Sequence, residues 1–298
     1  MIDEKYAAPS DESRASAPDM VIPIERLPPG FAQQVESPPK PAAAALPAST
    51  VVLMRDAEPG PEVLLLRRSR DSGFVPGAYV FPGGRVDDSD ADLSLRNRID
   101  GLPADVVPGV ASNENVPGSA YWIAAAREVF EETGILLAHN PKPATRNPQP
   151  DVIDTWRDRL LEDHATLLDV LCALDARLDL GEMVYCAHWI TPVAERRRYD
   201  TRFFLARVTY GHVVRLDARE MTDALWLTPR DALDRFADGA LPMVFPTVKT
   251  LESLASFTQV AQALDTFRER RIEPVLPRLV RTAAGVGIVV DRAAGRGD

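Results

Sequence analysis

Positions 127–135 hold the nonapeptide Arg127-Glu128-Val129-Phe130-Glu131-Glu132-Thr133-Gly134-Ile135. Three of its residues are carboxylates at i, i+3 and i+4, so on a helix Glu128, Glu131 and Glu132 lie on one face. Hard cations such as Mg²⁺ prefer carboxylate oxygens and commonly complete their coordination with substrate phosphates. The nonapeptide therefore predicts a metal-binding helix that acts on a phosphate-containing substrate. The alternative is an acidic helix face that is only solvated.

A glycine turn precedes this helix by about forty positions. It is the segment Phe81-Pro82-Gly83-Gly84-Arg85, which follows a short apolar run and lets the backbone approach an ion or a phosphate closely. Together the two segments resemble the box of the Nudix hydrolase family, G-x5-E-x7-R-E-U-x-E-E-x-G-U, in which U is apolar. The second half of that box matches at every fixed position of residues 127–135.

The first half of the box departs from the family pattern. Gly84 and Arg127 are 43 positions apart, against 14 in the uninterrupted box, which indicates an insertion of about 29 residues. Asp90 stands six positions after Gly84, and Ser119 stands eight before Arg127, so neither position holds the Glu of the family. We expect Ser119 instead to cap the helix that begins near Ala120, and we expect activity to survive without that Glu.

Composition excludes several classes of protein. The chain has 298 residues with 45% hydrophobic content, as in ordinary globular proteins, and a net charge of −10. This charge argues against nucleic acid and anionic membranes as partners. The two cysteines, Cys172 and Cys186, form no disulfide or zinc pattern. No secretory signal or membrane-spanning run is present, so we expect a cytoplasmic protein with a small-molecule substrate. A homodimer is among the assemblies to test.

The chain order predicts one α/β domain of the α+β type. Residues 1–46 are rich in Pro and Ala and are expected to be largely disordered, apart from an edge strand at 21–24. The domain then covers 47–298, with insertions at about 86–118 and 140–180. Strands are predicted at 50–55 and 62–68 as a hairpin, and at 78–81, 185–190, 201–208, 224–227 and twice within 272–290; helical structure is predicted at 93–98, 120–134, 152–174, 229–237 and 247–264. The Nudix resemblance implies the same architecture, a mixed sheet in an α/β/α sandwich.

The resemblance also implies roles for individual residues. Glu131 and Glu132 would bind Mg²⁺ or Mn²⁺ directly, with Glu128 as a third ligand, and the Gly83 carbonyl is a fourth candidate. The cation would stabilise phosphoryl oxygens and activate a water molecule. Arg127 would orient the Glu131 carboxylate by a charge-assisted hydrogen bond, or would form no more than a surface ion pair.

One further carboxylate is a candidate for acid–base chemistry. Glu220 precedes Trp226 by six positions, near the place where many Nudix relatives carry a loop acid that reaches the metal-bound water. It is a candidate general base in competition with Glu128, and the alternative is a solvated loop residue.

The residues before the glycine turn bear on the substrate. Residues 64–84 resemble the coenzyme A diphosphatase signature L-L-T-x-R-S-x3-R-x3-G-x3-F-P-G-G, which makes Arg68 a substrate-binding candidate. Leu66 replaces the Thr of that signature, and Gly73 replaces its second Arg. Arg198 and Arg202 are candidates for binding phosphates, or belong to a solvated charge run. Coenzyme A or acyl-coenzyme A is the favoured substrate. ADP-ribose, dinucleotides and dinucleoside polyphosphates stay open, as does a Nudix-fold sensor that does not cleave its ligand.

Overall fold

The computed structural model of the protein describes residues 17–72, 75–103, 116–140, 150–209 and 211–291. The chain divides into two compact units. The smaller unit takes residues 1–43, 192–196 and 276–298, and the larger unit takes residues 44–191 and 197–275. Each unit has a sheet of its own. The candidate site residues all belong to the larger unit.

The smaller unit is a three-stranded antiparallel sheet with a short helix. The central strand β13 (Gly285–Val289) is flanked by β1 (Met20–Pro23) and β12 (Arg278–Thr282). The 3-10 turn η2 (Ile24–Arg26) and helix α1 (Phe31–Glu36) follow β1. The edge strand expected at 21–24 is present, but the described part of residues 1–46 is more ordered than its composition predicts. The reason is that β1 pairs with a distant partner, with Met20 opposite Ile288.

The larger unit contains a mixed sheet with the strand order β11-β3-β2-β10-β9. These strands are β2 (Ala45–Arg55), β3 (Glu62–Arg68), β9 (Met183–Ile190), β10 (Arg198–Arg207) and β11 (Met221–Leu227), with the short strands β4 (Tyr79–Val80) and β5 (Gly83–Arg85) beside them. The β2–β10 pair is parallel and the other pairs are antiparallel.

The predicted hairpin of β2 and β3 is confirmed, but these two strands pair at only two positions before they separate. Beyond that point β5 pairs with β2 and β4 pairs with β3. Strand β5 thus contains the last three residues of the glycine turn, and its pairing with β2 holds the turn at the middle of the sheet.

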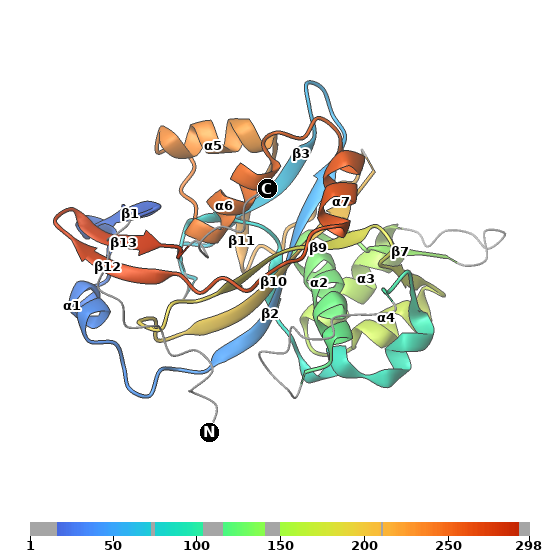
Figure 1. Cartoon of the computed structure of the whole chain (residues 1–298). Helices are drawn as coiled ribbons and strands as arrows, with labels where there is room; N and C mark the ends of the chain where they lie inside the picture. The colour runs from blue at the N-terminus through green and yellow to red at the C-terminus, as the bar shows by residue number, and fades with distance from the viewer. Residues whose placement is uncertain (1–16, 73–74, 104–115, 141–149, 210, 292–298) are drawn as a thin grey trace. The chain divides into compact units, whose positions relative to one another are not determined.

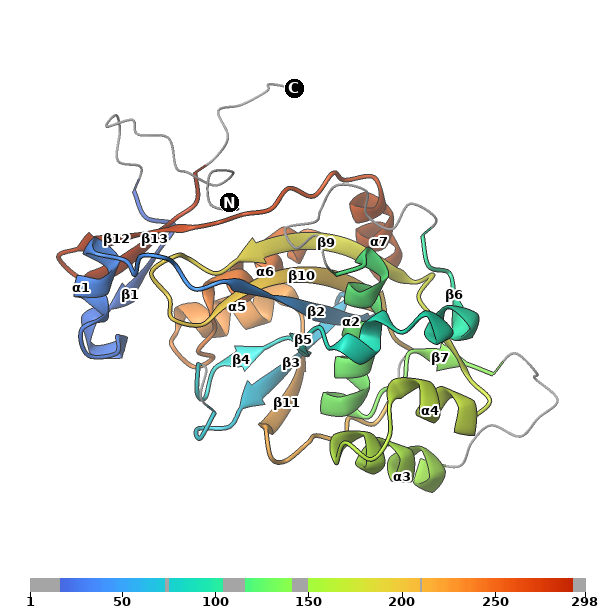
Figure 2. The same ribbon diagram turned by 90° about the horizontal axis from the view of Figure 1, so that it is seen from below.

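Helices cover both faces of this sheet (Figures 1 and 2). Helix α2 (Gly118–Thr133) packs Ile123 and Phe130 on one face, in a buried cluster with Leu53 and Leu66. Helices α5 (Pro229–Ala237) and α6 (Phe245–Leu254) lie on the other face, and α7 (Val260–Arg268) packs along β9. This is the α/β/α sandwich that was expected. The single helix predicted at 247–264 is two helices, α6 and α7, which are separate elements with residues 255–259 between them.

The two ends of α2 test the predictions made for Ser119 and Gly134. The helix begins at Gly118 after Pro117, and no side chain caps its first turn. Ser119 is therefore inside the helix, and its expected capping role is wrong because the helix starts at Gly118, two residues before the predicted start at Ala120. At the other end Gly134 adopts the left-handed conformation with φ 72°, as its place in the nonapeptide predicts.

The two insertions fold together beside α2. The first contributes η3 (Asp88–Ala91), η4 (Leu93–Arg98) and β6 (Ile99–Asp100); the second contributes β7 (Ala138–His139), α3 (Pro150–Leu161), α4 (Leu167–Ala173) and β8 (Arg177–Asp179). Strands β6, β8 and β7 form a small sheet, in which β8 joins the two insertions. Leu95, Leu171 and Leu178 continue the core of α2. Within the described ranges, no helix is long and apolar enough to cross a membrane.

Candidate active site

Helix α2 places the three predicted carboxylates beside the sheet. Glu132 is buried, with 4% of its surface exposed, while Glu128 and Glu131 are partly buried. The neighbours of these residues on the apolar face, Val129 and Phe130, are fully buried and fix the rotation of the helix against the sheet. The apolar face and the acidic face thus lie on adjoining sides of one helix, which is why the carboxylates are drawn partly into the interior.

The glycine turn contacts two of these carboxylates directly. The Gly83 N–H donates to Glu132 Oε2 at 3.0 Å. A Cβ atom at Gly84 would lie only 2.5 Å from Glu128 Oε1. Gly83 has φ 155°, and a Cβ there would lie 2.3 Å from the backbone oxygen of Ser49. Gly84 therefore allows β5 to lie close to Glu128 of α2, and Gly83 allows β5 to lie close to the backbone of β2.

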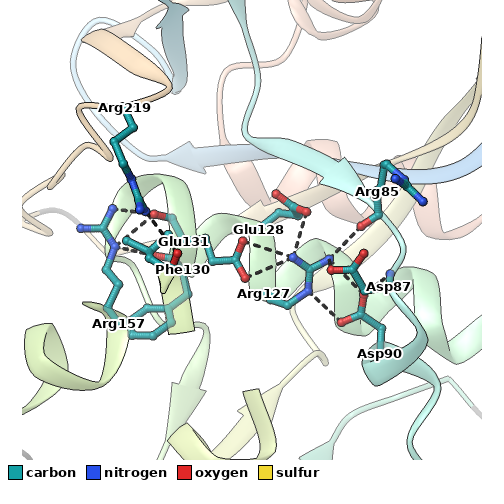
Figure 3. Close-up of polar contacts among 10 residues, drawn as sticks. Arg85, Asp87, Asp90, Arg127, Glu128, Phe130, Glu131, Arg157 and Arg219 are labelled. Atoms are coloured by element: carbon teal, nitrogen blue, oxygen red, sulfur yellow. Dashed lines mark hydrogen bonds and ion pairs between the residues drawn. The ribbon is translucent and has the colours of Figure 1, made fainter. Parts of the chain in front are cut away.

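The Arg127 guanidinium is the centre of the polar contacts in this site (Figure 3). Its Nη1 donates to Glu128 Oε1 at 2.9 Å and to Glu131 Oε1 at 3.1 Å, and its Nη2 donates to the Arg85 carbonyl at 2.7 Å. Only 4% of Arg127 is exposed. Arg127 is thus placed to orient Glu131, the role given to it from the sequence, and it holds Glu128 as well.

Asp90 is a site residue whose role was not predicted from the sequence. Its side chain is 1% exposed, and its two oxygens accept from Arg127 Nε at 2.9 Å and from Nη2 at 3.0 Å. The N–H of Asp87 donates to Asp90 Oδ2 at 2.8 Å and orients it further. An acid therefore does stand at six positions after Gly84, as the buried partner of Arg127. The spacing of Asp90 from Gly84 agrees with the family pattern and could have identified this residue. Asp90 was not identified because the family pattern has the longer Glu at this position.

Burial strongly perturbs the three carboxylates. It raises the pKa of Glu128 to about 8, against the pull of Arg127. The pKa of Glu132 is raised well above its usual range by burial and by the charge of Glu128, and burial also raises the pKa of Glu131. Buried anions with raised pKa values are stabilised in their charged form by a nearby cation.

The donors on α2 therefore fit a hard divalent cation in their chemistry, since all of them are oxygens. In the described part of the chain, no three acidic, histidine or cysteine side chains stand together as a ready-made metal site. Glu131 points to Arg127. A cation would have to share Glu131 with Arg127 or displace Glu131 from Arg127. The three carboxylates would therefore need a small rearrangement to bind the cation.

Two other predicted residues lie near Glu132. The Glu220 carbonyl accepts from the Ser69 N–H at 2.7 Å, which places Glu220 beside the end of β3, and its charge raises the pKa of Glu132. Arg68 donates to Ser72 Oγ at 2.8 Å, and its charge lowers the pKa of Glu132. The strands β3 and β11 thus bring both residues close to α2 from distant parts of the sequence. Their chemical roles remain predictions.

The arginines predicted on β10 have other surroundings. Arg202 is 2% exposed, and its guanidinium lies 3.6 Å from the centre of the Tyr121 ring of α2. It is a core residue rather than part of a solvated charge run, and its role in binding phosphates stays a prediction. The charged residues around Arg202 in the sequence indicate an exposed segment. The burial of Arg202 arises because it lies on the buried face of a central strand. Arg198 Nε donates to the Thr191 carbonyl at 3.0 Å, and its role in binding stays a prediction.

A cavity of about 340 Å³ opens beside Arg127 and Glu131. The two insertions line its other walls with Asp87, Ser89, Leu160, Asp163, His164, Ala165, Thr166 and Asp169. The insertions thus border the functional face of α2.

Comparisons with known proteins agree on one family. Residues 40–254 match the family model of the NUDT19 Nudix domain. The chain is 30% identical to the acyl-coenzyme A diphosphatase NUDT19 of Gallus gallus over 78% of this chain and 72% of that protein, and 29% identical to the same enzyme of Homo sapiens over 76% and 70%. A solved Nudix hydrolase from Alicyclobacillus acidocaldarius is 30% identical, with a TM-score of 0.64, and the match covers 77% of this chain and 99% of that one.

Proposed function

Because the chain belongs to the Nudix hydrolase family, in the group of the NUDT19 Nudix domain, we propose that it hydrolyses coenzyme A or acyl-coenzyme A. Water adds to one phosphorus of the diphosphate, and the bridging P–O bond breaks. The products are adenosine 3′,5′-bisphosphate and phosphopantetheine or its acyl form. One observation of the structure supports the hydrolysis above all, the contact of the Gly83–Gly84 turn with Glu128 and Glu132. The names of the relatives support the choice of substrate.

Nudix hydrolases generally use a divalent cation, and we propose Mg²⁺ or Mn²⁺ for this chain. Glu128, Glu131 and Glu132 would hold it, with the Gly83 carbonyl as a further candidate ligand. When bound, the cation would neutralise charge on the phosphoryl oxygens and lower the pKa of a water molecule. The protein supplies the orientation: Arg127 holds Glu128 and Glu131, and the Gly83 N–H holds Glu132.

Two residues are candidates for the general base. Glu220 lies near Glu132, whereas Glu128 is already bound to Arg127 and has its pKa raised to about 8 by burial. We favour Glu220, because Glu128 is held by Arg127 and is itself a candidate metal ligand. The variants Glu220→Gln and Glu128→Gln separate the two. The base variant should lose the acidic limb of the profile of kcat against pH, whereas loss of a metal ligand should raise the cation concentration that is needed.

A substrate panel tests the proposal. Purified protein is incubated with Mg²⁺ or Mn²⁺ and coenzyme A, acetyl-coenzyme A, ADP-ribose, NADH or diadenosine tetraphosphate, and the products are identified by mass spectrometry. We expect adenosine 3′,5′-bisphosphate from the two coenzyme A substrates. Glu131→Gln and Glu132→Gln should lower the rate by orders of magnitude. The matched control is Glu252→Gln, which removes an exposed carboxylate of α6 that pairs with Lys249.

The other outcomes of the panel assign other functions. Turnover of ADP-ribose alone would refute the coenzyme A substrate, and binding without turnover across the panel would favour a nucleotide sensor. The cytoplasm as the compartment and a homodimer as the assembly are secondary parts of the proposal. Localisation of a tagged chain and sedimentation at several protein concentrations test them.

A further inference from the structure

The C-terminal end of the metal helix is held from outside by hydrogen bonds to its last carbonyls. The final four carbonyls of an α-helix have no partner within the helix and are ordinarily left to caps or water. Here the Asp217 N–H donates to the Glu132 carbonyl at 3.3 Å, and the Arg215 N–H donates to the Thr133 carbonyl at 2.8 Å. The loop before β11 therefore accounts for two of the four.

The Phe130 carbonyl accepts from the N–H of the capping residue Gly134 at 2.9 Å, and both this carbonyl and that of Glu131 are also bound by a side chain of the second insertion. Arg157 of α3 donates from Nε to the Phe130 carbonyl at 2.9 Å, and from Nε and Nη2 to the Glu131 carbonyl at 3.1 and 2.5 Å (Figure 3). One planar guanidinium thus bridges two successive peptide groups. The second carbonyl belongs to Glu131, a predicted metal ligand, and its peptide group links Glu131 to Glu132.

The surroundings of Arg157 suit this role. The residue is only 6% exposed, and burial lowers its pKa, while the charge of Asp217 acts in the opposite direction. A buried guanidinium is costly to desolvate, and here it stands at the negative end of a helix, where a cation is favoured. Arg215 also forms an ion pair with Asp154 of α3, so that helix is tied to the end of α2 at a second point.

We propose that Arg157 is a positioning residue for the metal site, through which the second insertion sets the orientation of Glu131 and Glu132. Fixing the carbonyl of a residue fixes the peptide plane that follows it, and with it the direction of the next Cα–Cβ bond. The Gly83 N–H holds Glu132 from the sheet side, and Arg157 holds its backbone from the insertion side. The inference rests on the proposed function for its activity measurement, but its binding measurement is independent of any substrate.

The test uses Arg157→Met, which keeps an apolar side chain of similar length, and Arg157→Lys, which keeps the charge but loses the planar fork. The matched control is Arg159→Met on the same helix, because Arg159 is exposed and its guanidinium lies 4.3 Å from the ring centre of Trp156, away from these carbonyls. Mn²⁺ binding is measured by electron paramagnetic resonance, and kcat, KM and the thermal midpoint are measured on the same preparations.

Loss of a residue that orients metal ligands typically weakens metal binding by about 10–100-fold. We expect an increase of this order in the Mn²⁺ dissociation constant of Arg157→Met, a lower kcat with little change in KM, and partial recovery in Arg157→Lys. A lower thermal midpoint with wild-type Mn²⁺ binding and kcat would overturn the inference in favour of a purely structural arginine. If Arg157→Met does not fold, wild-type Mn²⁺ binding in Arg157→Lys overturns it. A wild-type protein that binds Mn²⁺ but cleaves no coenzyme A would refute the function alone.

Discussion

Adding one methyl group at Gly84 should lower activity by about 100-fold while the fold survives. The Cβ of Gly84→Ala would stand 2.5 Å from Glu128 Oε1, whereas ordinary contacts begin near 3.4 Å, so the carboxylate must move by about 1 Å. Gly84 is outside the left-handed region, so its backbone accepts alanine. The moving group is the end of a flexible side chain, and the movement breaks its 2.9 Å hydrogen bond with Arg127. Misplacement by 1 Å at a reacting centre can cost about 100-fold in rate.

The assay compares initial rates on the best substrate of the panel, together with the thermal midpoint. Gly84→Ala should lose about 100-fold in rate with a midpoint close to that of the wild type. Gly83→Ala should instead destabilise the fold, because its Cβ would meet the Ser49 backbone at 2.3 Å. Gly60→Ala, with nothing within 4 Å of its Cβ, serves as the neutral control. A wild-type rate in Gly84→Ala would refute the placement of Glu128 in the reaction.

Two further predictions concern the charges around α2. Asp90→Asn leaves Arg127 without its buried bidentate partner, and breaking such a pair typically costs about 3–5 kcal/mol, so urea unfolding should show a loss of this order that Asp90→Glu partly restores. The second concerns pH: Glu128 has its pKa raised from 4.5 to about 8, so the metal-free folded state holds its proton more tightly than the unfolded chain, and the free energy of unfolding should fall as pH rises through that window. Mn²⁺ should therefore raise the thermal midpoint more at pH 8 than at pH 5, and an equal gain would contradict the raised pKa.

Local features of the fold and site could be predicted, because short-range sequence determines them. The helix around Glu131, its glycine end and the turn at Gly83 all depend on residues within a few positions of one another. Long-range pairing could not be predicted in the same way. Strand β1 depends on β13 near the other end of the chain, and the burial of Arg202 depends on Tyr121, which only the packing of α2 on β10 brings beneath it.

The contacts between the two halves of the interrupted Nudix box explain why the insertions are compatible with the site. The first one lies between the glycine turn and Arg127, but Asp90 near its start still contacts Arg127, although 37 positions separate the two residues. The second one lies beyond Gly134 and returns through Arg157 to the end of the same helix. The helix is therefore held at Arg127 by Asp90 of the first insertion and at the Phe130 and Glu131 carbonyls by the second. The pairing of β8 with β6 joins the two insertions in one small sheet beside α2. Variation in these segments should thus alter metal affinity as well as the shape of the cavity beside Glu131.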